Sequence, residues 1–74
     1  MIPASNYWEE DFLGDQRTEY RTGAGELIGE VWKRGASWEV NRIRRGKVET
    51  IGTRLDKVTA QRCLINFIDA ESNA

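Results

Sequence analysis

The side chains most capable of chemistry in this chain are three consecutive carboxylates, Glu9, Glu10 and Asp11. Such groups act as a general acid and base when burial or a neighbouring charge shifts one of their pKa values. The chain has no histidine and only one cysteine, so it lacks the commonest acid–base group and cannot close a structural zinc site. Acidic side chains are also favoured at a helix start. We therefore predict a protein that is not an enzyme, with no catalytic residue, no metal and no cofactor.

Charge is distributed unevenly along the chain. Residues 1–31 contain seven acidic and two basic side chains, a net charge of −5, whereas residues 32–57 contain eight basic and three acidic ones, a net charge of +5. The total of −1 therefore conceals a basic middle. Such a segment can face an anionic partner, and nothing in the sequence indicates a small-molecule substrate.

The length and composition predict one globular domain that spans residues 1–74, with 39% hydrophobic and 31% charged residues. No apolar run approaches the roughly 20 residues that cross a bilayer, so we expect no membrane partner. The N-terminal residues have neither the basic nor the apolar segment of a signal peptide. Because Cys63 has no partner for a disulfide, a reducing compartment and a cytoplasmic location are expected.

The ends of the chain are expected to be helical. Asn6 and Glu9 resemble a capping box, Trp8 and Phe12 share one face, and Gly14 can end a short N-terminal helix. Near the C-terminus, Asp56 is a natural N-cap ahead of an apolar stripe with helical spacing. That stripe contains Ala60, Cys63, Leu64, Phe67 and Ile68, so Cys63 is interpreted as a packed core thiol.

The centre of the chain predicts antiparallel strands. Residues 26–34, 37–44 and 47–54 are separated by the two-residue turns Gly35-Ala36 and Arg45-Gly46, and residues 18–22 add a short edge strand. The expected fold is α+β, a three- or four-stranded antiparallel meander packed on the C-terminal helix. Its parts are an N-terminal helical or irregular segment (1–17), the sheet (18–55), the helix (56–70) and a frayed tail (71–74).

Two-residue turns fix the expected register, in which Lys33 faces Trp38, Val31 faces Val40 and Leu27 faces Arg44. The third strand would then place Ile51 opposite Val40 and Thr53 opposite Trp38. One sheet face would carry the core residues Leu27, Val31, Trp38, Val40 and Ile51 and receive the helix. The opposite face would mix large apolar and charged groups, and Trp32 lies at its centre. Either Trp32 packs beneath residues 7–20, or it forms an exposed aromatic platform beside Arg34 and Asn41.

Residues 31–70 carry a family resemblance. The run from Val31 to Val40, then Arg45-Gly46-Lys47, Ile51-Gly52-Thr53 and Ala60, resembles the arm-type DNA-binding domain of phage integrases and the similar domain of plant ethylene-response factors. Those domains lay the sheet face opposite the helix in the DNA major groove. The resemblance implies that Trp32, Arg34 and Asn41, with Arg45 and Lys47 at the hairpin tip, approach DNA. We expect these five residues and Arg44 to bind nucleic acid or another partner.

Two functions follow from these observations. The first is a non-enzymatic regulator of a phage or mobile element that binds nucleic acid through the basic meander. The second is a protein-binding inhibitor of host machinery, because a free-standing domain of this size and acidic start resembles in kind the small anti-CRISPR proteins of phages. That alternative would use the Trp32 face or the acidic N-terminal segment.

Overall fold

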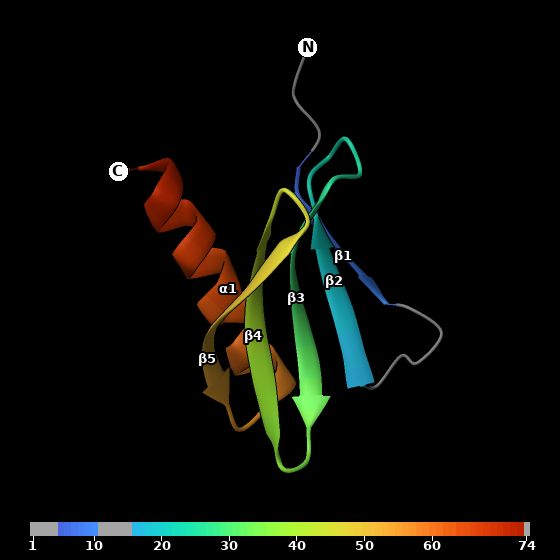
Figure 1. The fold of residues 1–74 in the computed structure, drawn as a ribbon, viewed down its shortest axis with the longest axis vertical. Helices are drawn as coiled ribbons and strands as arrows, with labels where there is room; N and C mark the ends of the chain where they lie inside the picture. The colour runs from blue at the N-terminus through green and yellow to red at the C-terminus, as the bar shows by residue number, and fades with distance from the viewer. Residues whose placement is uncertain (1–4, 11–15, 74) are drawn as a thin grey trace.

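The computed structural model describes residues 5–10 and 16–73, which form an antiparallel sheet and one helix (Figure 1). The strands pair in chain order, as a five-stranded meander. Their bounds are β1 Tyr7–Glu10, β2 Arg17–Arg21, β3 Leu27–Arg34, β4 Ser37–Arg44 and β5 Lys47–Arg54, and α1 spans Lys57–Ser72. The predicted α+β class and the meander packed on a C-terminal helix are confirmed, but the sheet has five strands instead of three or four.

The two hairpin turns lie where the sequence predicts them. Arg45 and Gly46 both have positive φ, 51° and 77°, which is the backbone of the two-residue turn that matches the twist of paired strands. Gly35 opens the β3–β4 turn with a φ of 61°. The register of β3 against β4 is also as predicted, since Val31 lies opposite Val40 and Lys33 opposite Trp38.

The predicted register of the last hairpin is wrong by one residue. Val40 lies opposite Gly52 instead of Ile51, and Trp38 lies opposite Arg54 instead of Thr53. The register shifts between Val40 and Asn41, where β5 carries one extra residue in a β-bulge. The extra residue is Ile51, which still packs against the core.

The prediction of an N-terminal helix is wrong for the described residues of that segment, because residues 7–10 form strand β1. Strand β1 pairs with β2, and Trp8 lies on the ring of Tyr20 with the ring centroids 4.5 Å apart. An isolated helix of this length is marginal, whereas pairing with β2 gives the backbone its hydrogen bonds. Consequently β2 is an inner strand rather than an edge. Residues 11–14 of the expected helix lie outside the described residues.

The helix begins at its predicted cap. The carboxylate of Asp56 accepts a hydrogen bond from the backbone N–H of Thr59 at 2.9 Å, and this bond lowers the pKa of Asp56. The helix buries Ala60, Leu64 and Ile68 against the sheet. Phe67, expected in the same buried stripe, is only partly buried, and Cys63 packs against the edge of the core.

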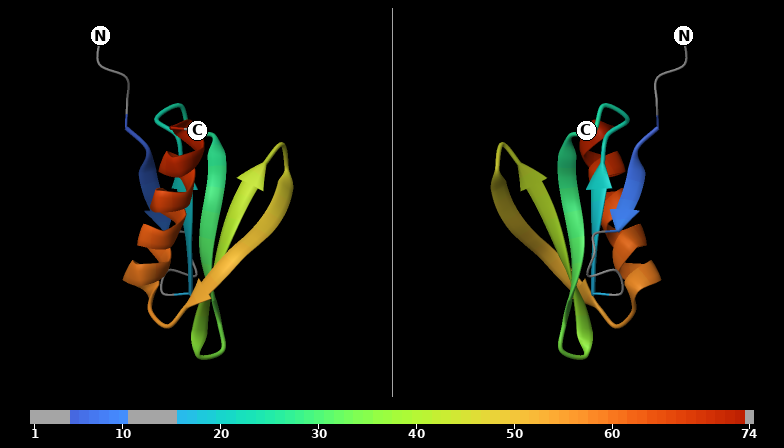
Figure 2. Two further views of the ribbon diagram at one scale, coloured as in Figure 1. Left: turned by 90° about the vertical axis from the view of Figure 1, so that its left-hand side faces the viewer. Right: turned by 90° about the vertical axis from the view of Figure 1, so that its right-hand side faces the viewer.

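The domain therefore has two layers, with the helix on one face of the sheet and β1 extending the edge (Figure 2). Residues that contribute most to the core are Tyr20, Val31, Trp38, Val40, Ala60, Leu64 and Ile68. Among residues 5–10 and 16–73, no helix covers the opposite face of the sheet, hereafter the open face. In the described part of the chain, no helix has the length and apolar character needed to span a membrane.

Candidate functional site

The six residues predicted to bind a partner fall in separate places. Trp32, Arg34 and Asn41 lie on the open face, because they alternate with the core residues Val31 and Val40. The other three, Arg44, Arg45 and Lys47, lie at the β4–β5 turn. Trp32 is paired with Glu39, which precedes Arg45 by six residues. A rise of about 3.3 Å per residue therefore separates Trp32 from Arg45 by roughly 20 Å.

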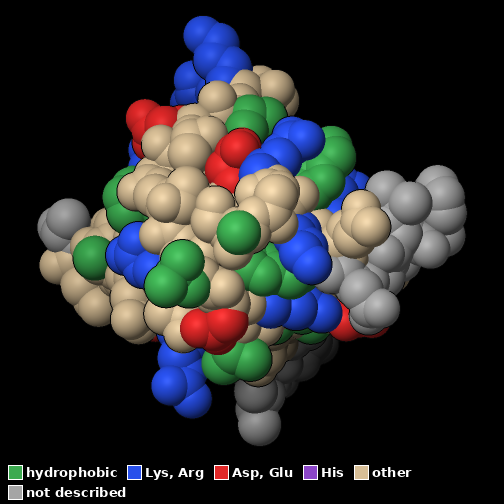
Figure 3. All heavy atoms as spheres, turned by 90° about the horizontal axis from the view of Figure 1, so that it is seen from below, with side chains coloured by type: hydrophobic (Ala, Val, Ile, Leu, Met, Phe, Trp, Pro, Cys, Tyr) green, Lys and Arg blue, Asp and Glu red, His purple; other side chains and the backbone are tan. Residues whose placement is uncertain are grey.

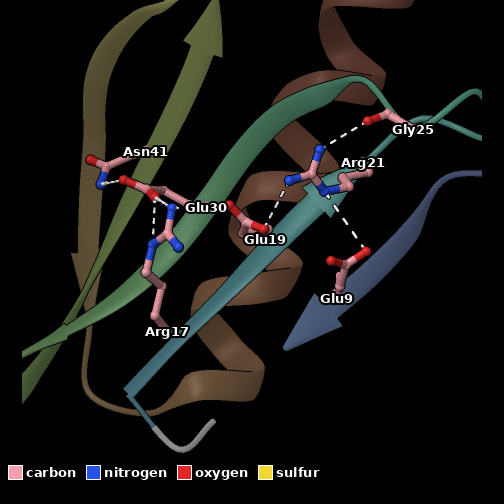
Figure 4. A network of polar contacts seen from close by, with 7 residues as sticks. All are labelled: Glu9, Arg17, Glu19, Arg21, Gly25, Glu30 and Asn41. Carbon is pink, nitrogen blue, oxygen red and sulfur yellow. Dashed lines mark hydrogen bonds and ion pairs between the residues drawn. The ribbon is translucent and has the colours of Figure 1, made fainter. Parts of the chain in front are cut away.

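A polar network crosses the open face from β2 to β4 (Figure 4) and reaches β5 through Thr50. Its central group is the carboxylate of Glu30, which is only 5% exposed. This carboxylate accepts hydrogen bonds from Arg17 Nε at 2.9 Å and from Asn41 Nδ2 at 3.2 Å. Asn41 Oδ1 in turn accepts a hydrogen bond from Thr50 Oγ1 at 2.8 Å. Buried polar groups with partners of this kind stabilise a fold because each donor and acceptor is satisfied.

The same network continues toward the β1 edge. Glu19 accepts hydrogen bonds from Arg17 Nη2 and from Arg21 Nη2, both at 3.0 Å. Arg21 also donates from Nη1 to the carbonyl of Gly25 at 2.9 Å, and its Nε lies 3.9 Å from Glu9. The hydrogen bond with Glu19 raises the pKa of Arg21. Positive and negative groups thus alternate and neutralise one another across this part of the open face.

Asn41 is therefore a structural residue in this arrangement. Its side chain is 1% exposed and both ends of its amide are hydrogen-bonded within the sheet. The sequence placed Asn41 on the correct face, but burial of the network removes it from the accessible surface.

Trp32 is partly buried and lies between two guanidinium groups. The Cζ atom of Arg34 is 3.9 Å from the ring centroid, and that of Arg17 is 5.3 Å away. Arg34 also forms an ion pair of 3.6 Å with Glu39. The first of the two alternatives is that Trp32 packs beneath residues 7–20. Strand β1 does not cover Trp32 in this way, because it joins the edge of the sheet beyond β2. Residues 11–15 of that segment lie outside the described residues.

The β4–β5 end carries a basic hollow of about 540 Å³. Its lining residues are Arg42, Arg44, Arg45, Lys47 and Glu49. Arg42 and Arg44 alternate with Val40 and so lie on the helix face, where Glu49 and Lys47 are their cross-strand partners. The hairpin tip splays away from the C-terminal end of the helix here (Figure 2). Side chains from two strands and the turn therefore converge around this hollow.

Two of these bases are held by the protein itself. Arg42 donates from Nη1 to the carbonyls of Ile28 at 2.6 Å and Ile43 at 2.8 Å, and from Nε to Glu71 at 2.7 Å. Arg44 pairs with the other carboxylate oxygen of Glu71. In contrast, Arg45 and Lys47 are exposed and have no hydrogen-bond or ion-pair partner among the described residues.

Sequence reasoning missed Arg42 and Glu71 as parts of this end. They are 29 residues apart, and only the packing of α1 against β4 brings them together. A signal was nevertheless present in the strand. Arg42 follows Val40 with the alternation of the core face, so its charge had to find a partner on the helix side.

The described residues contain no group of three or more histidine, cysteine, aspartate or glutamate side chains able to hold a metal ion. Comparison of the chain with protein-family models, curated proteins and solved structures finds no match. The function must therefore be argued from the two surfaces described above.

Proposed function

We propose that this protein is a small non-enzymatic domain that binds nucleic acid through its phosphates, using the β4–β5 end. The observation that supports the proposal most strongly is the exposed pair Arg45 and Lys47, which flank Gly46 and have no partner among the described residues. Free cations at a projecting turn can each neutralise a phosphate and release condensed counterions. Arg42 and Arg44 lie behind them as further donors.

The shape of this end also supports the proposal. The major groove of B-form DNA is about 12 Å wide and admits a two-stranded β-ribbon. The β4–β5 tip is such a ribbon, and it stands apart from β3 and the helix (Figure 2). The mode of contact differs from the one that the integrase resemblance implies, because the charges of the open face are largely neutralised within the protein.

The proposal is tested by fluorescence anisotropy with a labelled DNA duplex of about 20 base pairs. At about 50 mM salt we expect a Kd in the micromolar range, typical of sequence-independent binding. Arg45→Ala/Lys47→Ala should abolish binding at this salt. At lower salt, where residual binding can be followed, the double variant should reduce the slope of log K against log salt by roughly two contacts.

The matched control is Lys33→Ala/Arg54→Ala, which removes two exposed bases near the β3–β4 turn and the end of β5. Both double variants change the net charge equally, so only a local effect distinguishes them. Absence of binding by the wild-type protein at about 50 mM salt would refute the proposal, and so would an equal loss in both double variants.

A protein partner is the second candidate, and it is favoured by the lower end of the molecule. Hydrophobic and basic side chains interleave there, with acidic groups in small separate patches (Figure 3). Leu55, at the β5–α1 connection, is 85% exposed, and Val58 in the first helical turn is 55% exposed. Trp32 and Arg34 belong to the residue types that most often dominate protein interfaces. Retention of one protein from nuclease-treated host lysate by the wild type, but not by Trp32→Ala, would favour this candidate.

A further inference from the structure

The carboxylate of Glu71 bridges Arg42 and Arg44, the two β4 arginines that line the hollow. One of its oxygens lies 2.7 Å from Arg42 Nε, and the other pairs with Arg44 Nη2. The side chain of Glu71 is 26% exposed and that of Arg42 is 14% exposed, so the pair is shielded on one side. The position between the two guanidinium groups is therefore already occupied by an anionic group of the protein itself, the carboxylate of Glu71.

The position of Glu71 in the helix makes this arrangement unusual. Glu71 lies in the last turn of α1, which contains no basic side chain. The carbonyl groups at a helix C-terminus carry partial negative charge, so a carboxylate there is disfavoured. The arginines of β4 supply the attraction that offsets this repulsion. The intrahelical contribution therefore opposes the Glu71 carboxylate, and the two arginines hold it in place.

We propose that the position between Arg42 and Arg44, hereafter the phosphate seat, can bind a phosphate group of the nucleic-acid backbone, and that Glu71 occupies it and competes with that phosphate. This inference rests on the proposed function. Guanidinium groups bind carboxylate and phosphate with the same two-pronged geometry, so one group can replace the other. Arg42 remains in place during the exchange because two backbone carbonyls hold its Nη1. Arg44 is 55% exposed and can turn toward a ligand.

Displacement requires little movement of the protein. Rotation of the Glu71 side chain into solvent leaves the seat open beside Arg45 and Lys47, which line the same hollow. A phosphate in this position would contact Arg42 and Arg44, in a hollow that Arg45 and Lys47 also line and in which Glu49 is the acidic residue among the described lining residues. Glu71 thus sets how strongly the hollow attracts an anion, and it excludes ligands too weakly charged to displace it.

The test compares Glu71→Gln with the wild-type protein in the same duplex-binding assay. The amide keeps the shape of the side chain but removes its charge. We expect the affinity to rise about two- to fivefold, the range that an ion pair at a protein surface contributes. The slope of log K against log salt should steepen by roughly one phosphate contact.

The matched control is Glu10→Gln. Glu10 pairs with Lys57 Nζ at 2.8 Å, at the opposite end of the helix from Glu71. It changes the net charge by the same amount and also breaks one ion pair. An equal rise in both variants would show an effect of total charge and would overturn the inference. Where the wild type binds the duplex, unchanged or weaker duplex binding by Glu71→Gln, with a melting temperature near that of the wild type, would also overturn it.

A titration with inorganic pyrophosphate separates this inference from the proposed function. The chemical shifts of the arginine Nε–H groups report on the seat directly. If the wild type binds no duplex but Glu71→Gln binds pyrophosphate more tightly than the wild type does, the nucleic-acid proposal fails and the phosphate seat stands. If Glu71→Gln binds neither ligand more tightly than the wild type, the seat is refuted. Should Glu71→Gln prove unstable, Glu71→Asp offers a folded variant with a shorter reach, which should also bind more tightly than the wild type.

Discussion

The side chain of Leu64 lies directly on the backbone of Gly29, at the centre of the interface between helix and sheet. A Cβ atom added at Gly29 would come within 2.6 Å of Leu64 Cδ2 and 3.1 Å of the Asn41 carbonyl. Leu64 is fully buried. The absence of a side chain on β3 therefore determines how closely α1 can approach the sheet.

This contact gives the first prediction. Gly29→Ala should destabilise the protein by about 1–3 kcal/mol through overpacking, and Leu64→Ala by about 2–5 kcal/mol through loss of buried surface and a residual cavity. In the double variant the new methyl group enters the space that Leu64 leaves, so its destabilisation should be smaller than the sum. Urea unfolding of the four proteins measures this coupling. Strict additivity of the two effects would contradict the contact.

Phe67→Ala is the control within the same helix. The stripe in the sequence predicts a loss of about 3–5 kcal/mol for this substitution, as for a buried aromatic residue. Because Phe67 is only partly buried, we now expect a smaller loss than for Leu64→Ala. A lower melting temperature for Leu64→Ala than for Phe67→Ala would support partial burial of Phe67, and the reverse order would support the fully buried position that the sequence predicts.

A second prediction concerns the helix cap and its dependence on pH. The hydrogen bond from Thr59 holds the pKa of Asp56 below its ordinary value of 3.8. The stabilisation that the charged cap provides is therefore fully present above the unfolded-state pKa and is lost as the pH falls through the lower folded-state pKa. Asp56→Ala should lower the melting temperature at neutral pH, and the difference from wild type should shrink in acid.

Asp56→Asn provides the control for this prediction. Asparagine can cap the helix but does not titrate, so the difference in melting temperature between Asp56→Asn and Asp56→Ala should not change through the same pH range. A difference between the wild type and Asp56→Ala that stays constant from neutral pH to below the pKa of Asp56 would show that the carboxylate charge contributes nothing to the cap.

A third prediction assigns Asn41 to stability instead of binding. Asn41→Leu leaves the buried Glu30 without one of its donors, and such a loss costs about 1–3 kcal/mol. Duplex binding by the folded fraction should be unchanged. Urea unfolding combined with anisotropy checks both statements. Loss of binding with unaltered stability would return Asn41 to the interface.

The local parts of the fold were predictable from sequence, whereas pairings between distant segments were not. Gly35 and Gly46 mark the two hairpins because each turn depends on its own backbone geometry. Strand β1 has no such local signal, since its structure depends on pairing with β2. The bulge at Ile51 shifts the register beside Gly52, a residue that can mark a bulge within a strand but does not by itself determine which residue is left unpaired.

The same distinction applies to the candidate site. Arg45 and Lys47 flank a predicted turn, so their exposure follows from local structure. Glu71 and Arg42 meet only through tertiary packing, and Asn41 was placed on the accessible surface because its buried partner Glu30 lies on another strand. Alternation along a strand identifies the face of a residue but not the partners that cover it.

The last prediction separates the two candidate functions through Trp32. This residue lies on the open face, roughly 20 Å from the β4–β5 turn at about 3.3 Å per residue, and its ring contacts Arg34 at 3.9 Å. If phosphates bind at the turn, Trp32→Ala should leave both the duplex affinity and its salt dependence unchanged. If a protein partner uses the open face, truncation of such an anchor costs 2 kcal/mol or more, about a 30-fold loss of affinity. Trp32→Phe, which keeps an aromatic ring beside Arg34, should retain most of that affinity. A Trp32→Ala protein that is folded but has lost duplex binding would place the nucleic acid on the open face and refute the site at the turn.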